Sequence, residues 1–122
     1  MGNQELRNYL RPHRKKSGLS LRELAIIVGY AHKGQVSRHE RSEAVPPLTI
    51  AFGYAVVYRV SVSALFPGIY EEVREAVEAR LRELEQNLQD RRAKRGELEL
   101  IAQRLVWMME RRDGSGENED GN

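Results

Sequence analysis

The chain of 122 residues has no cysteine, which excludes disulfides, thiolate zinc sites and cysteine nucleophiles. No apolar run approaches the roughly 18 residues that a membrane-spanning helix requires. The first residues, MGNQELRNYL, lack the apolar stretch of a signal peptide and the Ser or Thr of a myristoylation signal. We therefore expect a soluble, cytoplasmic protein with one domain and a shorter appendage.

Catalytic and metal-binding motifs are missing as well. The histidines, His13, His32 and His39, are never three or four residues apart, the spacing with which a helix presents two ligands to one metal ion. The segment HKGQVS lacks the upstream glycine of a phosphate-binding loop, and no Gly-x-Ser-x-Gly nucleophile motif occurs. The sequence predicts no enzyme, no metal site and no cofactor.

The chain does carry many charges, and they are unevenly divided. Residues 1–66 contain ten Lys and Arg against four Asp and Glu, a formal charge of +6. Residues 67–122 contain ten basic residues against fourteen acidic ones, a formal charge of −4. A basic first half is typical of proteins that bind a polyanion, whereas the acidic second half indicates a different role.

Two helices in the first half have clear boundaries. Ser20 and Glu23 form the pattern of a capping box, and a glycine stands where a C-cap belongs, so we predict a helix over 20–28. The following helix, 33–41, has one apolar residue, Val36. We expect Val36 to be its single buried anchor, with the remaining residues offered to solvent or a ligand.

Three further helices complete a compact all-α domain over residues 1–66. The first places Leu6, Leu10 and Arg14 on one face, and Pro12 is expected to kink it or to delay its start. A helix that follows Pro46-Pro47 is expected to be well buried through its apolar residues, Leu48, Ala51, Phe52, Ala55, Val56 and Tyr58.

The domain is expected to close with a short helical turn that Ser61 or Ser63 caps. Its apolar face is formed by Val62, Leu65 and Phe66. Three aromatic residues of this part of the chain are expected in the core, namely Tyr54, Tyr58 and Phe66.

Good helix formers follow Pro67-Gly68, over residues 67–112. Four of their apolar residues have the alternating spacing of a coiled-coil seam: Val77, Leu81, Leu84 and Leu88. Charged residues flank this seam, so we expect it to join two copies of the chain, with packing against the N-terminal domain as the alternative. Residues 113–122 are polar and glycine-rich and are expected to be disordered.

Two arrangements of residues 67–112 fit the pattern. In the first, one long helix runs through Gly96. In the second, Gly96 ends one helix, and another helix forms a hairpin with it through Leu98, Ile101, Leu105 and Met108. In either arrangement we expect Trp107 to pack against a partner helix.

Residues 6–66 resemble the Cro and phage-repressor type of helix-turn-helix, the XRE family. The resemblance covers half of the chain and rests on many positions at the spacing of the family: Leu10, Arg14, Gly18-Leu19-Ser20, Leu24-Ala25, Gly29, Val36-Ser37, Glu40-Arg41, Pro47, Leu48 and Val62-Leu65-Phe66. It implies a five-helix, lambda-repressor-like domain. In that fold helix 33–41 enters the major groove of double-stranded DNA while helix 20–28 crosses the backbone.

The resemblance also implies roles for single residues. Base contacts fall on Lys33, Gln35, Ser37 and Arg38. Phosphate contacts fall on Arg22, His32, Gly34, Arg41 and Ser42, with Lys15 or Lys16 as further candidates. Arg14 and Glu40 are expected to form an internal salt bridge between the first helix and helix 33–41.

Three positions depart from the family pattern. The step from Gly29 to Val36 is seven residues where the family has six, so the base-reading positions are defined only to within one residue. Leu21 stands where the family often has a phosphate-binding glutamine. Pro12 lies within the first helix, close to Arg14.

The sequence therefore predicts a sequence-specific DNA-binding transcriptional regulator that acts as a homodimer, with repression as the default mechanism of the family. The alternative is an antitoxin or adaptor that binds a partner protein through residues 70–112 and uses DNA binding for autoregulation. A third possibility is a structural coiled-coil protein with a vestigial DNA-binding domain.

Overall fold

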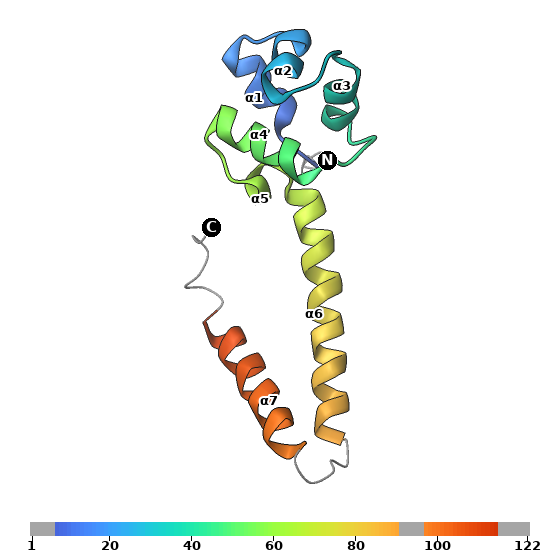
Figure 1. Cartoon of the computed structure of the whole chain (residues 1–122), viewed down its shortest axis with the longest axis vertical. Coiled ribbons are helices and arrows are strands. Elements are labelled where there is room, and N and C mark those ends of the chain that lie inside the picture. Colours follow the sequence, from blue (N-terminus) through green and yellow to red (C-terminus); the bar gives the residue numbers. More distant parts are fainter. Residues whose placement is uncertain (1–6, 91–96, 115–122) are drawn as a thin grey trace, which may run out of the picture. The chain divides into compact units, whose positions relative to one another are not determined.

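The computed structural model of the chain describes residues 7–90 and 97–114, and within these residues it contains helices and no strand (Figure 1). The all-α class is thus confirmed. The helices are α1 Leu10–Ser17, α2 Leu21–Val28, α3 Gly34–Glu40, α4 Leu48–Tyr58, α5 Val62–Leu65, α6 Pro67–Asp90 and α7 Leu98–Asp113. None of these helices is both long and apolar enough to cross a membrane.

The chain divides into two compact units, Met1–Glu72 and Val73–Asn122. Helix α6 therefore begins in the first unit and continues into the second. Its first turn is held in the first unit, where the Gly68 amide donates to the carbonyl oxygen of Arg7 at 3.1 Å. A Cβ on Gly68 would lie 3.0 Å from the Arg7 Cα, so this close approach requires glycine.

The boundaries of α1 and α2 follow from local chemistry. Pro12 is the third residue of α1, in the first turn, where an amide has no intrahelical acceptor. The helix therefore starts at Leu10 and Pro12 does not interrupt it. Ser20 caps α2 through the predicted capping box with Glu23, and Gly29 ends α2 with a φ of 110°.

The core of the first unit takes at least one buried side chain from each of α1 to α5. The buried apolar residues are Leu10, Leu24, Ala25, Val36, Ala51, Tyr54, Leu65 and Phe66. Tyr54 and Phe66 lie in the core as predicted, whereas Tyr58 packs at its edge. Ser61, rather than Ser63, caps α5 by accepting a hydrogen bond from the Ala64 amide.

Helix α4 is less buried than the sequence predicts. Leu48, Phe52 and Val56 expose 66%, 54% and 77% of their surface, so the prediction of a well-buried helix is wrong for them. The three stand four residues apart and form one stripe. The core is reached by the other side of α4, through Ala51 and Tyr54. Apolar residues occur on all sides of α4 itself, so its sequence could not indicate which side would face solvent.

The second unit contains an antiparallel hairpin of α6 and α7 (Figure 1). Its core consists of Leu88, Ile101 and Met108, against which two partly buried leucines, Leu81 and Leu105, pack. Two bidentate ion pairs also join the helices: Arg111 with Glu78 and Arg112 with Glu85. Of the two predicted arrangements, the structure therefore has the hairpin. Its connection, 91–96, lies outside the described residues.

The hairpin divides the predicted coiled-coil seam into two faces. Leu81 and Leu88 pack against α7 of the same chain, so they are not available to a second copy in this arrangement. Val77 and Leu84 stay exposed, at 40% and 44%. A heptad pattern does not reveal which helix it contacts, so the sequence could not distinguish a partner chain from α7 of the same chain. The predicted tail begins with Asp113, which still belongs to α7, and 115–122 lies outside the described residues.

Candidate nucleic-acid interface

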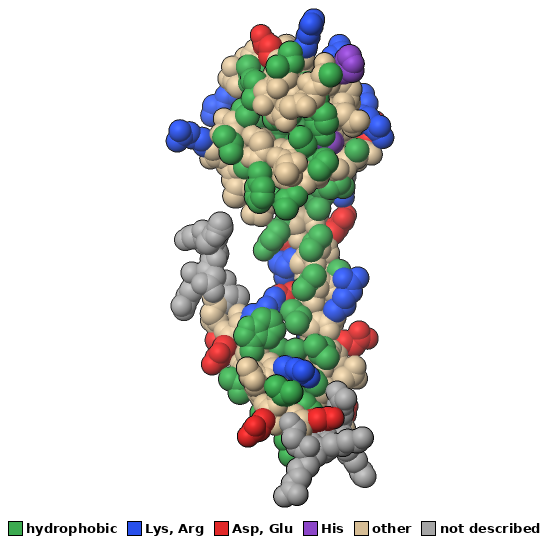
Figure 2. Space-filling view, viewed as in Figure 1, with side chains coloured by type: hydrophobic (Ala, Val, Ile, Leu, Met, Phe, Trp, Pro, Cys, Tyr) green, Lys and Arg blue, Asp and Glu red, His purple; other side chains and the backbone are tan. Residues whose placement is uncertain are grey.

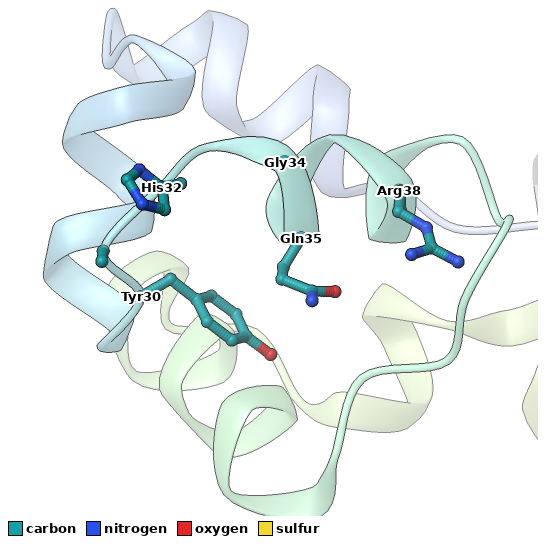
Figure 3. A pocket seen from close by; sticks show the side chains of 6 residues that line it. Tyr30, His32, Gly34, Gln35 and Arg38 are labelled. Carbon is teal, nitrogen blue, oxygen red and sulfur yellow. The ribbon is translucent and has the colours of Figure 1, made fainter.

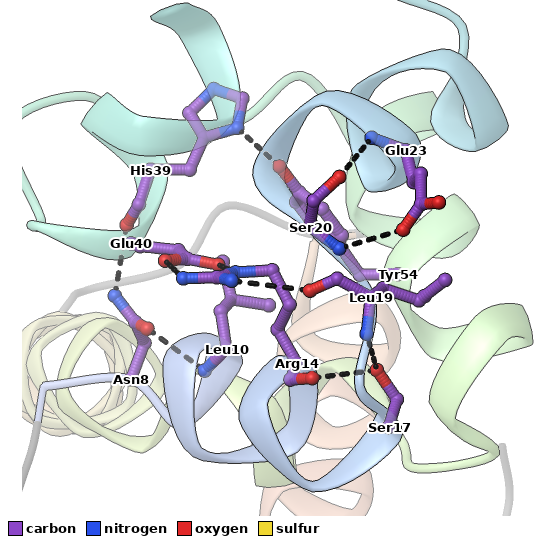
Figure 4. A network of polar contacts seen from close by, with 10 residues as sticks. All are labelled: Asn8, Leu10, Arg14, Ser17, Leu19, Ser20, Glu23, His39, Glu40 and Tyr54. Atoms are coloured by element: carbon purple, nitrogen blue, oxygen red, sulfur yellow. Dashed lines mark hydrogen bonds and ion pairs between the residues drawn. The ribbon is translucent and has the colours of Figure 1, made fainter. Parts of the chain in front are cut away.

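Helix α3 is fixed to the first unit by two buried side chains, Val36 and His39. The prediction of Val36 as the single anchor is therefore wrong. The His39 ring is 2% exposed, and its Nδ1 lies 2.8 Å from the Tyr54 hydroxyl (Figure 4). Burial lowers the pKa of His39, and the nearby Arg38 lowers it further, so His39 is a neutral part of the core.

Asn8 holds the C-terminal end of α3, a role that the sequence analysis missed. Its amide nitrogen donates to the carbonyl oxygen of His39 and to the Ser42 hydroxyl, each at 3.0 Å. Its carbonyl oxygen accepts from the Leu10 amide, where α1 begins (Figure 4). An Asn just before a helix is a local capping signal, but its contact with residues more than 30 positions away has no local signature.

Arg14 and Glu40 form a bidentate ion pair between α1 and α3. The nitrogen–oxygen distances are 2.7 Å from Nε and 3.1 Å from Nη2 (Figure 4). A third guanidinium nitrogen donates to the carbonyl oxygen of Leu19 at 3.2 Å. The hydrogen bond to Glu40 raises the pKa of Arg14. The pair fixes the orientation of α3 and leaves neither group free for a ligand.

The side of α3 opposite this pair is exposed and polar. Gln35 and Arg38 project from α3 into one surface hollow of about 320 Å³ (Figure 3). The hollow is lined by Tyr30, Ala31, His32, Gly34, Gln35 and Arg38. The structure thus brings together four of the predicted DNA-contacting residues, two assigned to bases and two to phosphates. It also adds Tyr30, whose ring lies across the hollow from α3.

The remaining predicted base contacts lie elsewhere on α3. Lys33 is exposed at the N-cap position. Ser37 is half-buried and lines a second, larger groove of about 670 Å³. This groove lies between α1, the first turn of α2 and α3, and its other lining residues are Asn8, Arg11, Pro12, Arg14, Lys15, Leu21, Glu40 and Arg41. Ser37 therefore faces a different part of the surface from Gln35 and Arg38.

The predicted phosphate contacts flank α3. Arg22 is exposed in the first turn of α2. Arg41 and Ser42 follow the last turn of α3, and Ser42 has a φ of 61°. Arg41 forms an exposed ion pair of 2.9 Å with Glu43, and breaking this pair costs little free energy. Lys15 lines the larger groove together with Arg11, a basic residue that the sequence analysis did not single out.

The charges of this region favour an anionic partner. Lys33, Arg38 and Arg41 are exposed on α3 and its ends, and the one carboxylate within α3 is Glu40, which Arg14 neutralises. In the part of the chain that the structure describes, no group of three or more His, Asp or Glu could hold a metal ion. The arrangement offers hydrogen-bond donors and positive charge on a helix that two buried side chains and an ion pair hold in place.

No protein-family model, no curated protein and no solved structure matches this chain.

Proposed function

We propose that the protein is a sequence-specific regulator that reads double-stranded DNA with α3 and acts as a dimer. The observation that carries this proposal is the two-sided construction of α3. Val36 and His39 anchor one side in the core, and Gln35 and Arg38, each one residue earlier, project together from the adjacent exposed side. The proposal includes a lambda-repressor-like fold for α1 to α5 and membership of the XRE family.

The dimensions of α3 suit a major groove. The groove of B-DNA, about 12 Å wide, admits an α-helix, and side chains near the helix N-terminus reach the base edges. A Gln side chain can pair with adenine and an Arg side chain with guanine through two hydrogen bonds each. We assign these roles to Gln35 and Arg38, which share one hollow and can therefore contact neighbouring base pairs.

Cations on both sides of α3 would position it on the backbone. Arg22 at the start of α2 and Arg41 after α3 are the phosphate contacts, with Lys15 on the rim of the larger groove. Leu21, which replaces the glutamine of the family pattern, leaves Arg22 as the side chain that supplies this contact at the start of α2.

Selection from a pool of random duplexes, at near-physiological salt, tests the proposal. We expect enrichment of an inverted repeat whose half-sites are about one helical turn, 34 Å, apart. The Arg38→Ala variant should lose about 1–3 kcal/mol of discrimination at one base position of each half-site. The matched control is Arg82→Ala on the second unit, which should leave the preference unchanged. Folded protein that enriches no duplex would overturn the proposal.

A partner-protein role is the second candidate, because α7 exposes large apolar side chains. Leu98, Val106, Trp107 and Met109 each expose half or more of their surface. An antitoxin or adaptor would cover them with another protein. Stable co-purification with a partner encoded beside this chain, in stoichiometric amounts, would favour this candidate over the regulator.

A further inference from the structure

One side of the α6–α7 hairpin is apolar along both helices and remains exposed. It is formed by Val77 and Leu84 of α6 and by Leu100 and Trp107 of α7, which we call the hairpin face. Their exposed fractions are 40%, 44%, 51% and 53%. Hydrophobic side chains are visible on both helices in Figure 2.

The position of Val77 and Leu84 follows from the contacts of α6. Each directly precedes a glutamate, Glu78 or Glu85, that forms an ion pair with an arginine of α7. One step back along an α-helix is a rotation of about 100°. Val77 and Leu84 therefore lie on the flank of α6, about a quarter turn from the side that meets α7.

The position of Leu100 and Trp107 follows from the same step on α7. Leu100 precedes Ile101 and Trp107 precedes Met108, and both following residues are buried against α6. Because the two helices are antiparallel, an equal backward rotation about each helix turns the side chains to the same side of the pair. The four apolar side chains therefore share one face, and a partner can contact all four at once.

The opposite side of the hairpin is different in composition. On α6 the residues that follow the contact positions are polar, since Arg82 follows Leu81, Gln86 follows Glu85 and Gln89 follows Leu88. Met109 of α7 lies on that side, one residue after Met108, and is 53% exposed. Val106, one residue after Leu105, lies on that side as well and is 51% exposed. The exposed apolar side chains of α6 in the second unit are therefore on the hairpin face, whereas those of α7 lie on both sides.

The hairpin has a small buried core. Its buried core is limited to Leu88, Ile101 and Met108 among the described residues. Small units with few buried residues are commonly stabilised by a metal, a disulfide or oligomerisation. The chain has no cysteine, and the described residues hold no cluster that could bind a metal. A second hairpin packed against this one would complete the usual four-helix arrangement.

A second copy fits the hairpin face better than a strongly charged partner. Arg80 and Arg104 precede Leu81 and Leu105 and so lie on this side of the hairpin. Glu83 stands three residues after Arg80 and Glu110 three after Trp107, positions that are adjacent on a helix surface. The rim of the face thus carries both signs, as an isologous interface needs when a patch meets itself.

We propose that the hairpin face binds the hairpin face of a second copy and forms a four-helix bundle. This inference rests on the dimer of the proposed function and names the surface that forms it. Exposed apolar patches of a few hundred Å² are typical of such sites, and a stable interface buries about 800 Å² per partner. Flanking residues such as Val73, which is 55% exposed, would have to contribute.

Sedimentation equilibrium of the full chain, over a concentration series without DNA, tests this surface. We expect a reversible dimer that Trp107→Glu weakens by roughly 30-fold or more, the scale of losing an interface tryptophan. The matched control is Met109→Glu, on the same helix with the same exposed fraction of 53%. It should dimerise like the unmodified chain. Far-UV circular dichroism establishes that both variants keep their helices.

The single tryptophan gives a second readout on the unmodified protein. Trp107 emission should shift to shorter wavelength, and iodide should quench it less, as the dimer forms. A monomer at every concentration, a dimer whose Trp107 stays accessible, or equal weakening by both variants would overturn the inference. The proposal of DNA reading is tested separately. If the protein is a monomer that still enriches a half-site, that proposal stands. If the protein is a dimer that enriches no duplex, that proposal is overturned.

Discussion

The ion pair between Arg14 and Glu40 is the interaction by which the first unit orients α3 most directly. The two side chains are 14% and 5% exposed, so both charges are largely removed from water. Replacing Glu40 with Ala would leave the guanidinium desolvated and without its carboxylate. We expect Glu40→Ala to lower the free energy of unfolding by about 3–5 kcal/mol, measured by urea denaturation.

An exposed pair just beyond the same end of α3 provides the control. Arg41 and Glu43 are 57% and 53% exposed, so Glu43→Ala should cost less than about 1 kcal/mol. An apolar pair, Arg14→Met with Glu40→Leu, should recover most of the stability that Glu40→Ala loses. Similar small losses for Glu40→Ala and Glu43→Ala would show that the Arg14 pair does not hold α3.

His39 should make folding stability depend on pH. Burial lowers its pKa in the folded chain, while the unfolded chain titrates near the ordinary pKa of about 6.5. Below that pH the unfolded state binds a proton that the folded state resists binding. Stability is therefore complete above about pH 6.5 and falls as the pH drops towards the lower folded pKa.

The measurement is the free energy of unfolding between about pH 7.5 and about pH 5.5, above the range in which carboxylates titrate. We expect a decrease over this interval in the unmodified chain and a weaker dependence in His39→Gln. Because the side-chain amide of the variant can still hydrogen-bond to the Tyr54 hydroxyl, the variant should fold at the upper pH. An unchanged pH profile in His39→Gln would assign the effect to another group.

At the scale of the element, a substitution of Gly34 should change the stability of α3 and its proposed DNA binding in opposite directions. A Cβ added to this first residue of α3 would meet no heavy atom within 4 Å. Gly34→Ala should therefore stabilise the helix by up to about 0.5–1 kcal/mol. If the N-terminus of α3 lies against DNA, the added methyl group should weaken duplex binding severalfold. Denaturation and duplex titration measure the two effects.

Gly29 gives the contrasting case for the same substitution. Its φ of 110° lies in the left-handed region, so Gly29→Ala should destabilise the chain even though its Cβ position is equally open. A Gly34→Ala variant that is more stable and binds DNA as tightly as the unmodified chain would remove the start of α3 from the interface.

Local chemistry explains which elements could be predicted. Ser20 with Glu23 and Ser61 with Ala64 form their caps within three residues, so the sequence places the start of α2 and limits the cap of α5 to Ser61 or Ser63. The exposed stripe of α4 could not be predicted, because apolar residues on all sides of the helix leave its orientation to tertiary packing. The same holds for Leu81, whose partner on α7 lies more than 20 residues away.

In the candidate site, too, the placement of some residues could be predicted from the sequence and that of others could not. Gln35 and Arg38 could be predicted, because three residues on a helix place two side chains on one side. The burial of His39 could not, because its partner Tyr54 comes from another helix. Ser37 faces a different groove from Arg38, since one residue along a helix turns a side chain by about 100°. A one-residue ambiguity in the turn therefore matters for base contacts.

At the scale of the whole molecule, the two units should respond differently to salt. Residues 1–66 carry a formal charge of +6, while the hairpin face is apolar with both signs of charge at its rim. If each copy contacts phosphates with Arg22, Arg41 and one of the lysines, a dimer neutralises about six phosphates. Affinity for the selected duplex should then fall about 1000-fold between about 50 and 200 mM salt.

Self-association should change little over the same range, because screening acts on exposed charges and leaves apolar contacts intact. Fluorescence anisotropy of a labelled duplex and sedimentation without DNA measure the two responses on the same preparation. Arg22→Ala should reduce the salt slope by about one per copy, whereas Arg38→Ala should change base preference. If salt dissociates the dimer and leaves duplex binding unchanged, the charged residues would instead mediate self-association and the apolar face would mediate duplex binding.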